Sequence, residues 1–140
     1  LELYLPLMSG ASLFLAEKSL TSSPSALIGL LNQSNITVMQ ATPTAWQMLL
    51  DHSWKGKGDL KVLCGGEAVQ PSLINKLSGK AKSMWNLYGP TEATIWSSSK
   101  LYNANSSINK TSIGRPISNT QIYILDRCLN TVPVGVSGEI

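Results

Sequence analysis

The sequence predicts an α/β fold, in which a parallel sheet with helices on both faces is followed by a smaller antiparallel β unit. Over the first two thirds of the 140 residues, short apolar runs alternate with helix-like stretches, as expected for a parallel sheet covered by helices. From Thr94 onward the apolar runs are separated by polar loops without a helix signal. We therefore divide the chain into an α/β portion, residues 1–93, and a mostly β portion, residues 94–140.

The elements of the first portion follow from their apolar spacing and their end signals. The expected strands span residues 12–16, 36–40, 60–64 and 83–87. The expected helices lie in residues 1–8, around residues 27–31, and in residues 43–50 and 72–77. Ser23 or Ser25 can cap the second helix, Pro43 suits the first turn of the third, and Gly79 follows the fourth.

The second portion has three strand-like runs, at residues 95–101, 121–125 and 136–140. Residues 102–111 between the first two are rich in Asn and Ser, which indicates an exposed loop.

Ligands of parallel α/β sheets bind beyond the carboxyl ends of the strands. Gln40, Gly65, Gly66, Leu87 and Tyr88 all fall at such ends. The strand order therefore predicts a binding site on this rim of the sheet.

Composition excludes several classes of function. The net charge is +3 and the basic residues are scattered, so no basic arm for nucleic acid is expected. Two cysteines and one histidine do not form a zinc or disulfide pattern. Without a signal peptide or an apolar run of about 18 residues, we expect no membrane span and a cytoplasmic location.

The most informative segment is residues 86–94, NLYGPTEAT. Tyr88 offers a flat ring for a purine, and the Gly89-Pro90 turn presets the loop. Thr91 can donate to a phosphoryl oxygen and Glu92 can hold magnesium. The segment suits a nucleotide phosphate with its metal.

The run Asn-x-Tyr-Gly-Pro-Thr-Glu resembles the signature loop of adenylate-forming enzymes, in particular the adenylation domains of nonribosomal peptide synthetases. Residues 63–68 (LCGGEA), 113–117 (IGRPI) with 121–126 (QIYILD), and 132–140 (VPVGVSGEI) resemble further family segments in order and spacing. The resemblance covers essentially the whole chain.

The resemblance implies a ligase reaction, in which the carboxylate of an amino acid attacks the α-phosphate of ATP. The products are an aminoacyl-adenylate and pyrophosphate, with Mg²⁺ as the metal. The implied partners are a carrier (thiolation) domain bearing phosphopantetheine, which is not in this chain, and a condensation domain.

The resemblance also assigns roles to residues. Tyr88 stacks on adenine, Asn86 meets the adenine edge, and the Gly65–Glu67 turn lines the other side of the purine. Thr91 and Glu92 are the expected catalytic residues, with Glu92 holding the metal. The expected nucleotide-binding set is Gly65, Gly66, Glu67, Asn86, Leu87, Tyr88, Gly89 and Thr91.

The family's substrate-pocket positions are mostly apolar and uncharged in this chain. They are Leu1, Gln40, Leu63, Gly65, Leu87, Ile95 and Trp96. A bulky indole and the absence of a charged partner predict a small uncharged amino acid, and the order of residues resembles pockets assigned to glycine, with alanine next. Ile95 and Trp96 can both face the pocket only where the strand is irregular.

Two other hypotheses for the function remain open at this point. The protein could be an acyl-CoA ligase of the same superfamily, or a non-enzymatic nucleotide-binding or interaction module. The family's phosphate loop and its ribose- and adenylate-binding residues are expected outside residues 1–140. We therefore expect this piece alone to be inactive.

Overall fold

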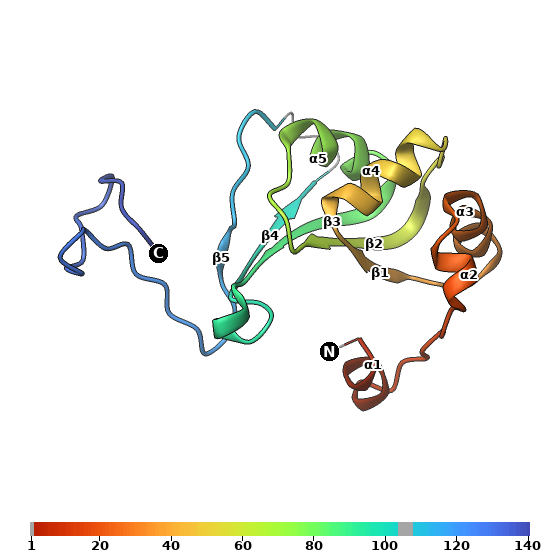
Figure 1. The fold of residues 1–140 in the computed structure, drawn as a ribbon, viewed down its shortest axis with the longest axis horizontal. Helices are drawn as coiled ribbons and strands as arrows, with labels where there is room; N and C mark the ends of the chain where they lie inside the picture. The colour runs from red at the N-terminus through yellow and green to blue at the C-terminus, as the bar shows by residue number, and fades with distance from the viewer. Residues whose placement is uncertain (1, 104–107) are drawn as a thin grey trace.

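The computed structural model describes residues 2–103 and 108–140, and it contains one five-stranded mixed sheet in the order β1-β2-β3-β4-β5 (Figure 1). The strands are β1 (Val38–Ala41), β2 (Lys57–Gly65), β3 (Ala81–Tyr88), β4 (Ser98–Tyr102) and β5 (Arg115–Pro116). The first three are parallel, and β4 and β5 continue the same sheet in antiparallel pairing. The predicted α/β class, parallel strands followed by antiparallel ones, is confirmed.

The three longest helices begin at signals that the sequence contains. The helices are α1 (Tyr4–Met8), α2 (Lys18–Thr21), α3 (Pro24–Gln33), α4 (Pro43–Asp51), α5 (Pro71–Ser78) and the 3₁₀ turn η1 (Thr91–Ala93). Proline opens each of the three longest helices, where its missing N–H costs nothing. The hydroxyls of Ser23 and Thr42 accept from the third residue beyond them and cap α3 and α4.

One face of the sheet carries the core. Figure 1 shows α4 and α5 lying along β2 and β3, and the β2 side chains Leu60, Val62 and Cys64 are fully buried in the same cluster as residues of both helices. From α4, Trp46 donates its indole N–H to the Leu63 carbonyl at 3.1 Å. This packing fixes the carboxyl ends of β2 and β3, where the site lies.

The opposite face is less buried. Leu63 and Trp85 are half-buried there, whereas Lys61 is exposed. Glu2, just before α1, accepts a hydrogen bond from Gln40 at 3.1 Å. Within the described ranges, no helix combines the length and apolarity needed to cross a bilayer.

The strand predicted at residues 12–16 is wrong. The segment is extended without strand pairing, and Phe14 and Leu15 are 54% and 74% exposed. A strand needs a neighbour for its backbone groups, and in the described part of the chain this segment pairs with none.

The antiparallel elements are shorter than predicted. The strand expected at 95–101 begins only at Ser98, because Thr94 and Ile95 have left-handed backbone angles, with φ of 59° and 76°. Instead of the strands at 121–125 and 136–140 there are isolated bridges from Leu125 to Thr131 and to Glu139.

Candidate functional site

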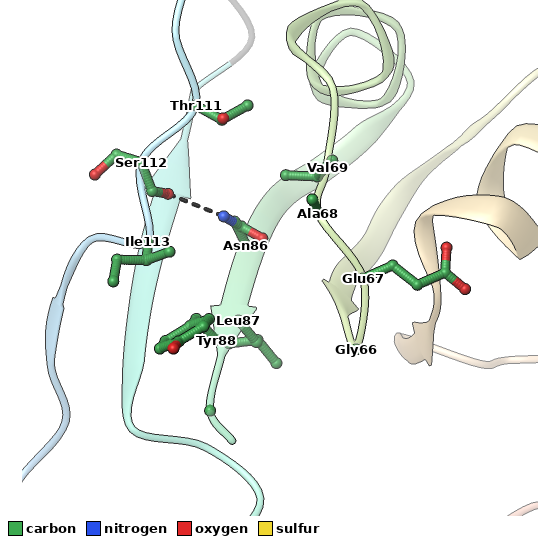
Figure 2. A pocket seen from close by; sticks show the side chains of 11 residues that line it. Gly66, Glu67, Ala68, Val69, Asn86, Leu87, Tyr88, Thr111, Ser112 and Ile113 are labelled. Atoms are coloured by element: carbon green, nitrogen blue, oxygen red, sulfur yellow. Dashed lines mark hydrogen bonds between the residues drawn. The ribbon is translucent and has the colours of Figure 1, made fainter. Parts of the chain in front are cut away.

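A cavity of about 380 Å³ opens beyond the carboxyl ends of β2 and β3 (Figure 2). Three segments line it: residues 66–69 after β2, residues 86–89 at the end of β3, and residues 111–113 from the connection between β4 and β5. The cavity therefore lies at the rim where parallel α/β sheets bind their ligands.

Six of the expected nucleotide-binding residues line this cavity together. They are Gly66, Glu67, Asn86, Leu87, Tyr88 and Gly89. Tyr88 is half-buried, and Figure 2 shows its ring at the end of β3 near Ile113. The flat ring is thus available to a ligand and is not packed into the core. Gly65 and Thr91 do not line the cavity.

Asn86 is 6% exposed, and its Nδ2 donates to the Ser112 carbonyl at 2.9 Å. Its amide has a second donor hydrogen and an acceptor oxygen. Asn86 therefore holds the opposite wall of the cavity, and its second amide hydrogen and its amide oxygen remain able to bond a ligand.

The Glu67 carboxylate points away from the cavity toward α4 (Figure 2). It accepts from the Thr44 hydroxyl at 2.6 Å and from the Thr44 backbone N–H at 3.3 Å. These hydrogen bonds, the hydroxyl one first, lower the pKa of Glu67. The carboxylate is thus hydrogen-bonded to the first turn of α4. Glu67 borders the cavity with its backbone and the methylene groups of its side chain.

Thr91 and Glu92 are exposed on η1, the short turn that follows Gly89. Over residues 2–103 and 108–140, no group of three His, Cys, Asp or Glu side chains could hold a metal ion. Nucleotide-bound Mg²⁺ does not need such a group, because one or two carboxylates and the phosphate oxygens suffice. The single exposed carboxylate of Glu92 fits that type of site.

The Trp96 indole packs directly against Gly65. A Cβ built on Gly65 would lie 2.5 Å from Trp96 Cη2 and 2.7 Å from the Leu87 carbonyl oxygen. Only glycine leaves room for the ring at this position. Trp96 Nε1 is buried and has no hydrogen-bond partner among the described residues.

The predicted pocket residues gather on the less buried face of the sheet. Gln40 is directly paired with Leu63, and Gly65 with Leu87, and paired residues share a face. With Trp96 on Gly65, five of the seven predicted positions adjoin. Leu1 lies outside the described residues.

Ile95 and Trp96 are not part of a regular pleat. Left-handed angles at Thr94 and Ile95 interrupt the chain, and the Trp96 N–H donates to the Thr94 carbonyl at 3.0 Å. A Cβ at Gly89 would collide with the Ile95 carbonyl oxygen. The irregularity that two adjacent pocket residues require is therefore present, with Ile95 44% exposed at the edge.

Sequence reasoning missed five residues that line the cavity: Ala68, Val69, Thr111, Ser112 and Ile113. Ala68 and Ile113 fall in the family-like segments 63–68 and 113–117, but the sequence assigned neither a role in the site. The other wall residues carry no distinctive chemistry in sequence.

The model of one protein family, described as AMP-binding enzyme, matches residues 1–140. The chain belongs to the AMP-binding enzyme family. It is similar to the "Dimodular nonribosomal peptide synthase" of Bacillus subtilis (strain 168), with 44% identity over 140 residues, and to the "PKS-NRPS hybrid synthetase ATPKS" of Aspergillus niger, with 40% identity over 140 residues. The alignments cover 100% and 99% of this chain but only 6% and 7% of those relatives. Within the family, the chain is part of an adenylation domain of the nonribosomal peptide synthetase type.

Solved structures also share the fold, and two of them are compared with this chain. A four-domain nonribosomal peptide synthetase, holo-AB3403, bound to AMP and glycine, is 43% identical with a TM-score of 0.90, over 98% of this chain and 10% of that one. The N-terminal subdomain of Klebsiella oxytoca NpsA, in complex with 3-hydroxybenzoyl-AMSN, has a TM-score of 0.77 at 20% identity, over 99% of this chain and 36% of that one. The second likeness concerns the fold alone.

Proposed function

We propose that this chain supplies the adenine and amino-acid sites of a domain that activates a small uncharged amino acid with ATP. The products are the aminoacyl-adenylate and pyrophosphate. The observation that carries the proposal is that one rim has a cavity beside Tyr88 on one side and the Gly65–Trp96 contact on the other. A nucleotide site and a compact apolar site adjoin at the strand ends.

The chain's own residues bind and orient in this reaction. Tyr88 stacks on the purine, the backbone of Gly66 and Glu67 borders its other side, and Thr91 donates to the α-phosphate. Glu92 would hold Mg²⁺, and the bound ion would offset the negative charge of the phosphate oxygens toward the carboxylate of the amino acid. Holding two anionic reactants in contact supplies much of the catalysis.

Glycine is the favoured substrate and alanine the next. The Trp96 ring lies where any β-substituent on Gly65 would collide, so the wall leaves little volume, and the predicted pocket has no charged side chain. The related synthetase holo-AB3403 was crystallised with AMP and glycine, which agrees with this order.

An acyl-CoA ligase needs a longer tunnel, which Trp96 obstructs. A non-enzymatic module is disfavoured by membership in an enzyme family. The other proposed partners are those that the resemblance implies: a condensation domain, and a carrier domain whose phosphopantetheine thiol would receive the aminoacyl group with release of AMP. The similarity to a nonribosomal peptide synthase supports them. Two free cysteines, one of them exposed, suit the reducing cytoplasm.

The test is ATP–pyrophosphate exchange by the intact synthetase, measured with each amino acid in turn. Glycine should give the highest kcat/KM, with alanine second. Glu92→Ala should reduce exchange at saturating substrates, and Thr91→Ala should do so more mildly. Exchange that does not depend on any amino acid, or that is indifferent to both variants, would contradict the proposal.

A further inference from the structure

The wall segment, residues 111–113, has no regular secondary structure, yet it forms one side of the cavity. Such a connection holds its place only if side chains satisfy its backbone groups. Three side chains from two strands do so. They are Asn86 of β3, and Ser98 and Tyr102 of β4.

Tyr102 makes the most specific contact. Its hydroxyl oxygen accepts from the Ser112 N–H at 2.8 Å and donates to the Ser112 carbonyl at 3.2 Å. The side chain is 4% exposed and does not line the cavity. One buried hydroxyl therefore fixes both backbone groups of a single wall residue.

The neighbouring bonds complete the attachment. Ser98 Oγ donates to the Ile113 carbonyl at 2.8 Å, and Asn86 donates to the Ser112 carbonyl at 2.9 Å. Nearer the start of the connection, Asn75 donates to the Ile108 carbonyl at 3.1 Å and accepts from the Ile108 N–H at 3.0 Å. The connection that contains the wall is thus hydrogen-bonded to the sheet at residues 112–113 and to α5 at residue 108.

We propose that Tyr102 and Asn75 are positioning residues for the nucleotide. Tyr102 holds Ser112 of the wall at the base-binding side of the cavity, Asn75 holds Ile108 earlier in the same connection, and neither touches the ligand. The inference rests on the proposed nucleotide site. It predicts that loosening the wall weakens nucleotide binding and leaves amino-acid binding unchanged, because the Gly65–Trp96 contact lies on the other side of the rim.

The decisive variant is Tyr102→Phe in the intact synthetase, since it removes the hydroxyl and keeps the ring. We expect the KM for ATP to rise about fivefold to tenfold, with the KM for the amino acid within about twofold of wild type. Tyr123→Phe is the matched control, because Tyr123 is exposed and, among the described residues, its hydroxyl donates only to Gln121 nearby. An unchanged KM for ATP, or an equal rise in both KM values, overturns the proposal.

Asn75→Ala guards against misfolding of the first variant. Asn75 is exposed on α5, and alanine is a better helix former, so the helix should be retained. We expect about a threefold rise in the KM for ATP, and no rise would contradict the role of Asn75.

Direct titration with AMP separates this inference from the proposed function. If wild type binds AMP but Tyr102→Phe binds it more weakly, the positioning role stands even where wild type shows no amino-acid-dependent exchange. Equal AMP affinity in the two proteins overturns the positioning role even where exchange is intact.

Discussion

On one side of the β2–β3 rim the chain is fixed by hydrogen bonds, and on the other it is fixed by close contact. The proposed nucleotide side uses Asn86, Ser98 and Tyr102 to hold a wall that has no regular structure. The proposed amino-acid side uses the Trp96 ring on Gly65, and the indole N–H there has no hydrogen-bond partner in the part of the chain that the structure describes. Hydrogen bonds suit the attachment of a wall segment that is distant in sequence from the strand that holds it. Steric contact suits a site that selects amino acids by the size of their side chains.

The largest effect is expected from Gly65→Ala, which tests the contact side. The new Cβ meets Trp96 and the Leu87 backbone, and a backbone atom cannot yield. We expect a loss of roughly 3 kcal/mol in unfolding free energy or, where the ring shifts instead, a large rise in the amino-acid KM.

Denaturant unfolding and exchange kinetics measure the two outcomes. Gly58→Ala is the control, because it lies in the same strand and its Cβ would meet nothing within 4 Å. If Gly65→Ala matches Gly58→Ala in stability and kinetics, the contact does not limit the site.

Trp96→Ala should enlarge the amino-acid site. We expect the preference for larger side chains over glycine to rise about tenfold or more, measured as the ratio of kcat/KM values. Trp85→Ala removes an equal side chain on the same face, two residues before Leu87, and should keep the wild-type ranking. An unchanged ranking in Trp96→Ala would place the indole outside the pocket.

Tyr88→Ala tests the nucleotide side. Loss of ring stacking should raise the KM for ATP about tenfold while the amino-acid KM changes little. Tyr88→Phe keeps the ring and should stay near wild type. A large effect of Tyr88→Phe would mean that the hydroxyl, and not stacking, provides the binding.

The smallest effect is expected from Glu67→Gln. Because hydrogen bonds from Thr44 lower the pKa of Glu67 below its ordinary 4.5, the charged form stabilises the fold above that pH. This stabilisation is lost as the pH falls through the lowered pKa. The difference in Tm between wild type and variant should therefore be present at neutral pH and vanish in acid; a difference that grows in acid would refute this sign.

Local signals account for what the sequence predicted well. Ser23, Pro43 and Gly79 mark helix ends through their own backbone chemistry, and apolar runs mark β2 and β3. Strand order also predicted the rim, and six of the residues that we propose for nucleotide binding line one cavity there.

Long-range pairing accounts for what the sequence could not predict. The apolar run at 12–16 has strand composition, but a strand depends on neighbours that composition does not reveal. The wall at 111–113 depends on hydrogen bonds to Asn86 and Tyr102 across the sheet, and the left-handed angles at Thr94 and Ile95 occur in β-branched residues that ordinarily avoid them.

The connection from β3 to β4 bears Gly89, which lines the cavity, and Trp96, which packs on Gly65, and its two arms touch where Gly89 meets Ile95. Because the two proposed ligands bind beside this shared backbone, the effect of each ligand on the affinity for the other can be measured. Whatever factor nucleotide binding applies to amino-acid affinity, the amino acid must apply to nucleotide affinity in return. The coupling free energy that this short stretch of chain transmits between the two reactants is therefore the same whichever of them binds first.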